Sequence, residues 1–372
     1  MRLLHIVSHP IQYHAPLFRR IAAEPGIELR VLFLRDTEDG YFDPGFAQTV
    51  RWDVPLREGY DSAFWRQADW KREIANCDAV WVHGWQGMKM LGAIAHAHAL
   101  GKPVLMRGEN TDGAMPDGRG LKGWLKRRFL EQVFARCDLF LSIGRANRDY
   151  YLRRGIPAER IFQMPYAVDN DFFSARARAA RPHRAELRRA LGLEDRPVIL
   201  YAGKLVARKH PEWLLRAWTG AVWPGPKPIL LYVGSGEMRA GLERNAPADV
   251  RLVGFRNQTE MPALYDLADV FVLPAEREPW GLAVNESMAC GTAVVVSDQV
   301  GCAADLVDPA CGAIVRLGDD VALGRALVDV LGRAQDAGDA ARRKISGWNF
   351  DADVRGLRSA LDALVARAGA SP

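Results

Sequence analysis

Short apolar runs alternate with longer stretches of helical character along most of this chain. The first series of runs lies at 3–7, 29–34, 79–82, 103–106 and 139–143. A second series begins at Pro197 and continues at 229–233, 250–253, 269–273 and 293–297. Because strands that alternate with helices pair in parallel, each series predicts an α/β unit built on a parallel sheet.

The length and the gap between the two series predict two domains. The chain has 372 residues, and domains commonly take roughly 100–200 residues. The gap is an Arg/Ala-rich stretch, 174–196, that follows the turn-like segment YAVDNDFF and carries no strand pattern. We therefore expect one domain over 1–168, a second over 169–348, and a C-terminal amphipathic helix over 349–372 that packs back on the first domain.

Composition excludes several classes of protein. Lys and Arg exceed Asp and Glu by 50 to 45 and are spread along the chain, so nucleic acid is not an expected partner. Five cysteines without a CxxC pair argue against a disulfide framework and a thiolate zinc site, and favour a reducing cytoplasm. The start, MRLLHIVSHPIQYH, lacks the apolar stretch of a signal peptide. No window approaches the ~18 apolar residues of a membrane span, so any membrane contact is expected to be peripheral.

In open parallel sheets, ligands bind beyond the carboxyl ends of the strands. After the strand DVFVLP, the segment EPWGLAVNE places Glu278 and Glu286 around a turn and a helix start. Glycine at 281 permits close backbone approach, and the free N–H groups of Gly281, Leu282 and Ala283 form an anion site. The alternative is an ordinary helix N-terminus with two acidic residues.

A second segment, GKLVARKH, follows the strand PVILYA. Lys204 and Lys209 are placed to bind a phosphate pair as point charges. The alternative is a solvated rim of the strand end.

Several segments together resemble family 4 of the retaining glycosyltransferases. They are EPWGLAVNESMACGTAVVVSD, VGFRNQTEMPALYDLADVFVLP, GKLVARKH, YVGSGEMR and YAVDNDFF, which stand in the family's order over 160–300. The N-terminal half matches in its βα layout and in HPIQYHAPLFR. The resemblance implies a GT-B fold, in which two Rossmann-like, doubly wound domains face each other across a cleft that holds a nucleotide-sugar.

The resemblance also implies roles for individual residues. Glu278 would contact the donor sugar near the reacting carbon, Glu286 the ribose, and Lys204 and Lys209 the diphosphate. The donor-binding residues expected on this basis are Gly203, Lys204, Lys209, Gly254, Phe255, Gly281, Leu282, Ala283 and Glu286. The family usually has Arg where Lys204 stands, and Lys keeps the charge but loses the bidentate geometry.

The catalytic residues expected are Glu278, Glu109 and His9. Glu109, in RGENTDG, stands about where the family offers a histidine, and its alternative is an ordinary loop acid. His9, like the expected acceptor-side residues Gln12, Tyr13 and His14, lies in HPIQYH, whose alternative is a capped turn before a helix. Arg107 is also expected on the acceptor side, and His83 is expected to be a packed histidine. Acceptor specificity is assigned to loops 9–14, 36–46 and 107–117.

The segment DND at 169–171 is assigned no metal, because it lies in the interdomain turn. Gly234 and Gly236 in VGSGEMRAG are expected to form a turn lining the cleft, because Arg239 stands where a dinucleotide fingerprint needs its third glycine.

The stretch 119–136 carries six basic residues and one acid among apolar ones. It is interpreted as a surface helix that buries its apolar stripe in the first domain. The alternative is a helix lying on the inner face of the plasma membrane.

The sequence therefore predicts a retaining, metal-independent glycosyltransferase without a bound cofactor. It would move sugar from a UDP-, GDP- or ADP-sugar to a glycan, lipid-linked or small-molecule hydroxyl, in bacterial glycan, polysaccharide or glycolipid assembly. The alternatives are a non-catalytic GT-B-like binding subunit, a nucleotide-sugar epimerase or a phosphorylase. The donor base, the sugar, the acceptor and the oligomeric state are not legible in the sequence.

Overall fold

The computed structural model describes residues 1–37 and 40–369, and these divide into two units. Unit 1 comprises 1–37, 55–166 and 350–369 of the described residues, and unit 2 comprises 40–54 and 167–349. The last three residues of the expected C-terminal helix, and residues 38–39 of the expected loop 36–46, lie outside the described part.

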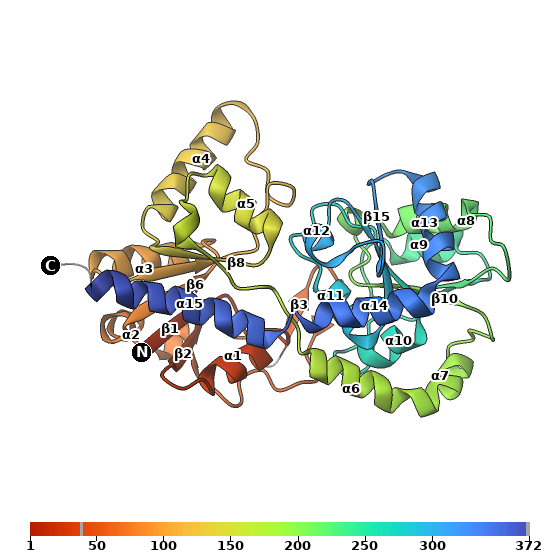
Figure 1. Cartoon of the computed structure of the whole chain (residues 1–372), viewed down its shortest axis with the longest axis horizontal. Coiled ribbons are helices and arrows are strands. Elements are labelled where there is room, and N and C mark those ends of the chain that lie inside the picture. Colours follow the sequence, from red (N-terminus) through yellow and green to blue (C-terminus); the bar gives the residue numbers. More distant parts are fainter. Residues whose placement is uncertain (38–39, 370–372) are drawn as a thin grey trace. The chain divides into compact units, whose positions relative to one another are not determined.

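Unit 1 is built on a parallel sheet with the strand order β5-β2-β1-β6-β7-β8-β9 (Figure 1). Its strands are β1 (Arg2–Val7), β2 (Glu28–Phe33), β5 (Asp61–Phe64), β6 (Ala79–His83), β7 (Val104–Arg107), β8 (Leu139–Ser142) and β9 (Ile161–Gln163). Its α-helices are α1 (Ala15–Ala22), α2 (Trp70–Asn76), α3 (Met88–Ala99), α4 (Gly120–Phe134), α5 (Arg145–Arg153) and α15 (Phe350–Gly369).

Unit 2 has a second parallel sheet, with the order β12-β11-β10-β13-β14-β15. Its strands are β10 (Val198–Ala202), β11 (Ile229–Val233), β12 (Val250–Leu252), β13 (Val270–Leu273), β14 (Ala293–Ser297) and β15 (Gly312–Val315). Its α-helices are α6 (Asn170–Ala180), α7 (Arg184–Ala190), α8 (Pro211–Gly220), α9 (Arg239–Asn245), α10 (Met261–Leu267), α11 (Leu282–Cys290), α12 (Ala303–Leu306), α13 (Asp320–Gly332) and α14 (Ala334–Ser346).

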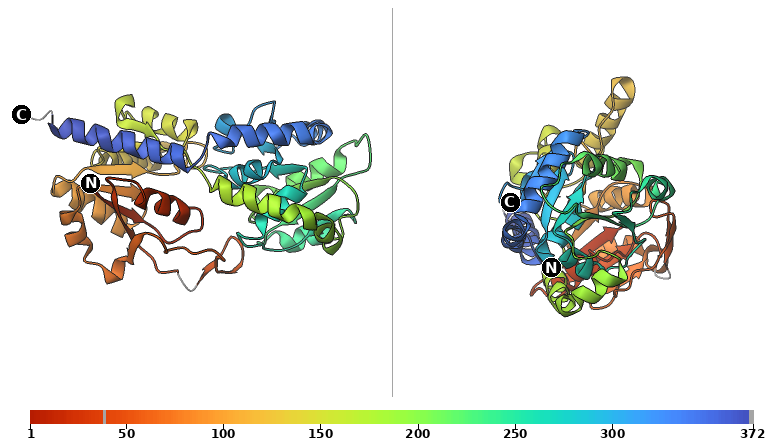
Figure 2. Two further views of the ribbon diagram at one scale, coloured as in Figure 1. Left: turned by 60° about the horizontal axis from the view of Figure 1, so that its bottom comes forward. Right: turned by 90° about the vertical axis from the view of Figure 1, so that its right-hand side faces the viewer.

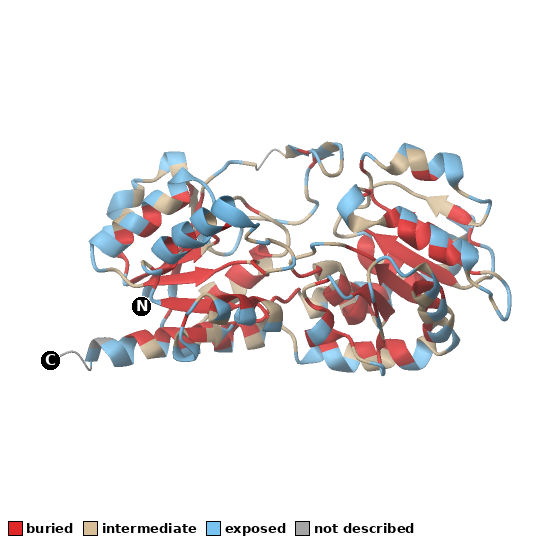
Figure 3. Ribbon diagram, turned by 90° about the horizontal axis from the view of Figure 1, so that it is seen from above, coloured by how far each residue is buried: buried red, intermediate tan, exposed pale blue. Residues whose placement is uncertain are grey.

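The central strands of both sheets are almost continuously apolar and buried (Figure 3). Helices cover both faces of such a sheet, which is why these strands lack the alternation of a half-exposed strand. The two series of apolar runs thus form two parallel sheets, as predicted. The five cysteines are buried free thiols. None of the helices in the described residues is long and apolar enough to cross a membrane.

A hairpin from the first half of the chain belongs to unit 2. Strands β3 (Tyr41–Asp43) and β4 (Gln48–Val50) pair antiparallel within 40–54. Asp43 accepts a hydrogen bond from Nζ of Lys204 at 2.8 Å, and the side chain of Asn257 donates to the backbone oxygen of Arg51 at 2.7 Å. The expected assignment of all of 1–168 to one domain is therefore corrected for this segment, because its polar anchors lie on unit 2.

The helix α15 belongs to unit 1 and is fixed there by buried contacts (Figure 2). Nη2 of Arg107 on β7 lies 3.0 Å from Oδ1 of Asp353, and both side chains are fully buried. At Gly356 a Cβ atom would lie only 2.0 Å from the backbone oxygen of Gln163, so only glycine permits this approach to β9. Burial raises the pKa of Asp353 to about 7, although the Arg107 charge acts in the opposite direction.

Candidate functional site

The loop that carries Glu278 follows β13 in unit 2 and is held by backbone pairing. The N–H of Gly301 donates to the backbone oxygen of Glu278 at 2.9 Å, and the N–H of Cys302 donates to that of Trp280 at 3.0 Å. Arg277 has φ 52°, a left-handed conformation that costs energy for a residue with a side chain. The strain stands immediately before Glu278, where surrounding contacts fix the direction of its carboxylate.

The turn into α11 is built on a glycine. Gly281 has φ 102°, and a Cβ atom there would lie 2.9 Å from a side-chain atom of Leu273. The helix begins at Leu282, so the N–H groups at its first turn have no partner within the helix. The turn thus offers N–H groups at the positive end of the helix dipole.

Lys209 and Arg208 meet Glu278 at the carboxyl end of β10. Nζ of Lys209 forms an ion pair with Oε2 of Glu278, and Nη1 of Arg208 lies 3.5 Å from the same oxygen. The N–H of Glu276 donates to the backbone oxygen of Arg208 at 2.7 Å, which ties the two loops together. Sequence reasoning selected Lys209 and Glu278 but missed Arg208, which stands beside Lys209 in the same motif.

Lys204 lies on the same loop but has a different partner. Its Nζ pairs with Asp43 at 2.8 Å and lies 5.1 Å from the ring centre of Phe46. Burial opposes ionisation of Asp43, but Lys204 and the N–H groups of Gly45 and Phe46 hold the pKa of this carboxyl below its usual value. Asp43 of the hairpin is thus the counter-charge of Lys204, the lysine that we expected to bind a diphosphate.

Glu286 lies on α11, away from these cations. The hydroxyl of Tyr265 donates to its Oε2 at 2.7 Å. Burial raises the pKa of Glu286 to about 7, while the hydrogen bond from Tyr265 acts in the opposite direction.

Phe255 lies against the aromatic side of the hairpin. Its ring centre is 5.0 Å from that of Phe46 and 6.2 Å from that of Trp52. The backbone oxygen of the preceding Gly254 accepts the N–H of Gly234 at 2.8 Å, and the N–H of Gly203 donates to Val233 at 2.9 Å. The expected donor-binding glycines therefore lie in connected loops at the strand ends of unit 2.

Unit 1 has its own cluster at the carboxyl ends of its strands. The hydroxyl of Tyr166 donates to Oε1 of Glu109 at 2.5 Å, and His14 Nε2 lies 3.2 Å from the same hydroxyl. His83, the last residue of β6, places Nε2 3.6 Å from Oε1 of Glu109. The rings of His14 and His83 are 4.8 Å apart. Sequence reasoning placed Glu109 and His14 in the site, set His83 aside and missed Tyr166, whose only sequence signal is its position at the start of the linker.

The electrostatics of this cluster favour an ionised Glu109 beside a neutral His14 and a neutral Tyr166. Burial opposes its ionisation, but contacts from His83, Tyr166 and Arg107 hold the pKa of Glu109 below its usual value. Burial and the neighbouring His83 lower the pKa of His14 well below its usual value. Burial and Glu109 raise the pKa of Tyr166. The cluster thus presents a carboxylate beside the neutral imidazole of His14 and the neutral hydroxyl of Tyr166.

Two expected residues have other surroundings. Nδ1 of His9 lies 2.9 Å from the hydroxyl of Ser8 and 3.2 Å from a guanidinium nitrogen of Arg35. Arg107 is fully buried, with its guanidinium on Asp353 and on the backbone oxygens of Met164 and Pro165. The expectation that Arg107 faces an acceptor is therefore corrected, because its charge is enclosed in the core.

The remaining acceptor-side residues precede α1. Gln12 and Tyr13 are half-buried there, and the ring of Tyr13 lies 5.9 Å from that of Tyr166. Oε1 of Gln12 and Nδ1 of His14 are buried and have no hydrogen-bond partner among the described residues. In the DND segment, Asp169 caps α6 by accepting the N–H of Phe172 at 2.9 Å.

Two family models match the chain, one in each half. The model described as "Glycosyl transferase 4-like domain" matches residues 11–167, and the model described as "Glycosyl transferases group 1" matches residues 196–333.

Curated relatives align over parts of their length. The GDP-mannose-dependent alpha-(1-6)-phosphatidylinositol monomannoside mannosyltransferase of Mycolicibacterium smegmatis is 29% identical over 72% of this chain and 74% of its own. The D-inositol 3-phosphate glycosyltransferase of Xylanimonas cellulosilytica is 30% identical over 59% of this chain and 56% of its own. The alpha-D-kanosaminyltransferase of Streptomyces kanamyceticus is 28% identical over 52% of this chain, which spans only 50% of that relative.

Solved structures match the whole chain. HepE of Anabaena, determined with UDP, has a TM-score of 0.73 at 14% identity and covers 98% of this chain and 100% of its own. Sucrose-phosphate synthase of Thermosynechococcus elongatus has a TM-score of 0.67 at 19% identity and covers 99% of this chain and 100% of its own. These matches confirm the predicted GT-B fold. With both halves matched by its models, the chain belongs to the group 1 glycosyltransferases, family 4.

Proposed function

We propose that this protein is a retaining glycosyltransferase that moves a sugar from a nucleotide diphosphate sugar to a hydroxyl acceptor. The observation that carries the proposal is the convergence of Lys209, Arg208 and Glu278 beside the glycine turn at Gly281. Cations and aligned N–H groups stabilise a diphosphate, and the adjacent carboxylate accepts hydrogen bonds from sugar hydroxyls.

The leaving group determines what unit 2 must do. Cleavage of the bond between the anomeric carbon and the phosphate oxygen leaves negative charge on the diphosphate. Lys209, Arg208 and the N–H groups at the start of α11 are placed to stabilise that charge where it develops. Glu278 would hold the donor sugar near the reacting carbon, and Glu286 would accept hydrogen bonds from the ribose.

On the acceptor side we propose the cluster of Glu109, Tyr166, His14 and His83. Buried polar atoms without a partner cost free energy, and Gln12 and His14 each carry one in the described structure. Acceptor hydroxyls would supply those partners. In the proposed retaining reaction the acceptor hydroxyl attacks the anomeric carbon on the face from which the phosphate leaves. The departing phosphate takes the proton of that hydroxyl. The cluster is therefore needed only to position the acceptor.

The donor, the acceptor and the cellular location that we propose rest on the chemistry of the site and on the names of the relatives. We propose a UDP-, GDP- or ADP-sugar as donor, no metal and no bound cofactor, and a cytoplasmic location. HepE was determined with UDP, and the mycobacterial relative is named as GDP-mannose-dependent. Relatives act on phosphatidylinositol mannosides or inositol phosphate, by their names. A glycan or lipid-linked acceptor in bacterial glycan assembly fits both.

Calorimetric titration with UDP, GDP and ADP, with and without EDTA, tests the donor side. We expect metal-independent binding of one nucleotide, weakened about 10- to 100-fold in Lys209→Ala because a charge-assisted contact is lost. Lys344→Ala, which removes a lysine paired with Asp308 elsewhere in unit 2, is the matched control. If no nucleotide binds, the transferase proposal is wrong.

Measuring turnover and nucleotide affinity in the same variant tests whether Glu278 acts in the reaction or in binding. Glu278→Gln should lower transfer or donor hydrolysis by about 100-fold while leaving nucleotide affinity within a few-fold. Glu276→Gln, two residues earlier and paired with His210, is the control. Equal turnover in the Glu278 variant and the wild type would remove Glu278 from the site.

A further inference from the structure

The helix α4 of unit 1 is apolar on two opposite faces. Its inner face is buried through Gly123, Leu130, Val133 and Phe134. Its outer face exposes four large apolar side chains: Leu121 (71% exposed), Trp124 (49%), Leu125 (52%) and Phe129 (41%). Leu121, Leu125 and Phe129 follow each other at four-residue spacing, so they form one row along the helix.

The inner row agrees with the expectation that the helix buries an apolar stripe in the first domain, but the outer row adds a second, exposed apolar stripe. In the outer row, the ring of Phe129 lies 5.6 Å from that of Trp85, and the guanidinium of Arg128 lies 5.8 Å from the ring centre of Trp124. On the other helices in the described residues, exposed large apolar side chains occur singly. A contiguous exposed apolar row indicates a surface that docks on something.

Charge indicates what that surface meets. Arg119, Lys122, Arg127 and Arg128 are exposed on and beside the row. The stretch 119–136 has one acid, Glu131, and it lies 2.9 Å from Arg128. Two copies of this surface would bring like charges together, whereas an anionic bilayer offers phosphates to the cations and acyl chains to the apolar row.

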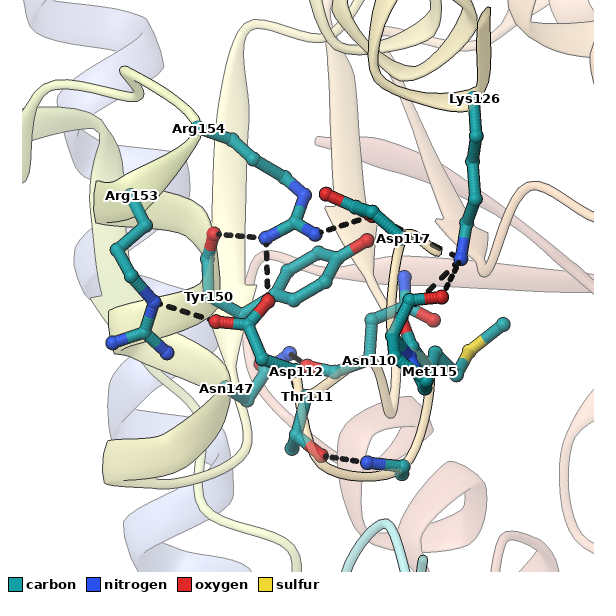
Figure 4. Close-up of polar contacts among 12 residues, drawn as sticks. Asn110, Thr111, Asp112, Met115, Asp117, Lys126, Asn147, Tyr150, Arg153 and Arg154 are labelled. Carbon is teal, nitrogen blue, oxygen red and sulfur yellow. Dashed lines mark hydrogen bonds and ion pairs between the residues drawn. The ribbon is translucent and has the colours of Figure 1, made fainter. Parts of the chain in front are cut away.

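Polar contacts hold α4 and the loop before it against the rest of unit 1, as Figure 4 shows. Nζ of Lys126 on the inner side donates to the backbone oxygen of Pro116 at 2.9 Å. Arg154, which directly follows α5, binds Asp112 at 2.9 Å and Asp117 at 2.7 Å, which holds the loop that leads into α4. In Figure 1 and in the right-hand view of Figure 2, α4 stands out from its sheet. The outer row is therefore presented by a fixed support.

We infer that the outer face of α4, comprising Leu121, Trp124, Leu125 and Phe129 with their flanking cations, docks on an anionic lipid surface. The apolar side chains enter the interface, where tryptophan is favoured, and the cations bind lipid phosphates. The loop 107–117 that carries Glu109 leads directly into this helix, so docking brings the acceptor-side cluster to the membrane surface.

Vesicle flotation of the full chain tests this inference. We expect binding to vesicles of equimolar phosphatidylglycerol and phosphatidylcholine, and at least about tenfold weaker binding to phosphatidylcholine alone or at high salt. The double variant L121E/L125E should lose at least about tenfold in partitioning, and K122E/R127E should lose a similar factor. Met88→Glu, at a highly exposed apolar position on α3, is the matched control and should bind as the wild type does.

Each result has one meaning. All substitutions are at exposed positions, so the variants should unfold at the same temperature as the wild type. A matching unfolding temperature shows that weaker vesicle binding does not come from a loss of folding. Unchanged binding in L121E/L125E overturns the inference, and so does equal loss in Met88→Glu. If vesicles are not bound and L121E/L125E instead abolishes a dimer seen by sedimentation, the surface belongs to a second copy and the inference is wrong. Donor binding is measured separately and does not depend on this result.

Discussion

Ion pairs in this protein range from fully buried to well exposed to solvent. Arg107 on β7 and Asp353 on α15 form a pair with no exposure, while Arg20 on α1 and Asp351 on α15 form an exposed one. Removing one member of a buried pair leaves an uncompensated charge in the core, whereas an exposed pair contributes little. The two pairs therefore offer a direct comparison.

Asp353→Ala should lower the free energy of unfolding by about 3–5 kcal/mol, because Arg107 is left buried without its counter-charge. Urea unfolding measures the change. Asp351→Ala, two residues earlier and on the exposed side of α15, should cost at most about 1 kcal/mol. Equal effects of the two substitutions would mean that the buried pair is hydrated in solution.

Glu286→Gln should alter how stability depends on pH. The folded pKa of Glu286 is raised to about 7, above its unfolded value, so its contribution to stability is present below the unfolded pKa and is lost as pH rises through the folded one. The Gln variant should therefore gain stability over the wild type as pH rises from about 4.5 to 7, by about 3 kcal/mol in total. Chemical unfolding across this range measures it, with Glu243→Gln at an exposed position as control. A difference that stays constant with pH contradicts the raised pKa of Glu286.

At the scale of elements, the alternation of apolar runs was enough to predict both sheets. Outside the hairpin β3–β4, the strands it missed, β5, β9 and β15, are edge strands of three or four residues, too short to stand out. The glycine turn at 281 and the lysines after β10 were found because strand-to-helix junctions are where ligands bind. The hairpin 40–54 and Tyr166 were missed because both depend on contacts with residues more than fifty positions away, which local patterns do not encode.

The hairpin leads to a prediction about Lys204. Asp43 and a diphosphate are both anions that would occupy the same ammonium group, so Asp43→Asn should tighten nucleotide binding about fivefold. Calorimetry measures this affinity. Asp53→Asn is the matched control, because Asp53 anchors the same hairpin through Thr259 without contacting Lys204. Weaker binding in Asp43→Asn would mean that Asp43 orients Lys204 for the phosphate and does not compete with it.

At the scale of the molecule, all proposed donor contacts lie in unit 2. Hydrogen exchange with and without the nucleotide that binds should therefore show slower exchange at 203–210 and 281–283. The Lys209→Ala variant, at the same nucleotide concentration, should show little change because binding is weakened. Slowed exchange confined to unit 1 would place the nucleotide on the wrong unit and contradict the donor assignment.

The route of the chain between the units has a consequence for its synthesis. The chain leaves unit 1 before residue 40, returns at 55, leaves again at 167 and returns at 350. When a ribosome has made 300 residues, most of unit 1 has been synthesised but α15 has not, so Gln163 on β9 and the charge of Arg107 lack the contacts that α15 later makes. Because folding during synthesis generally proceeds domain by domain from the N-terminus, the second unit can complete its sheet before the first is sealed. No single proteolytic cut would release either unit whole.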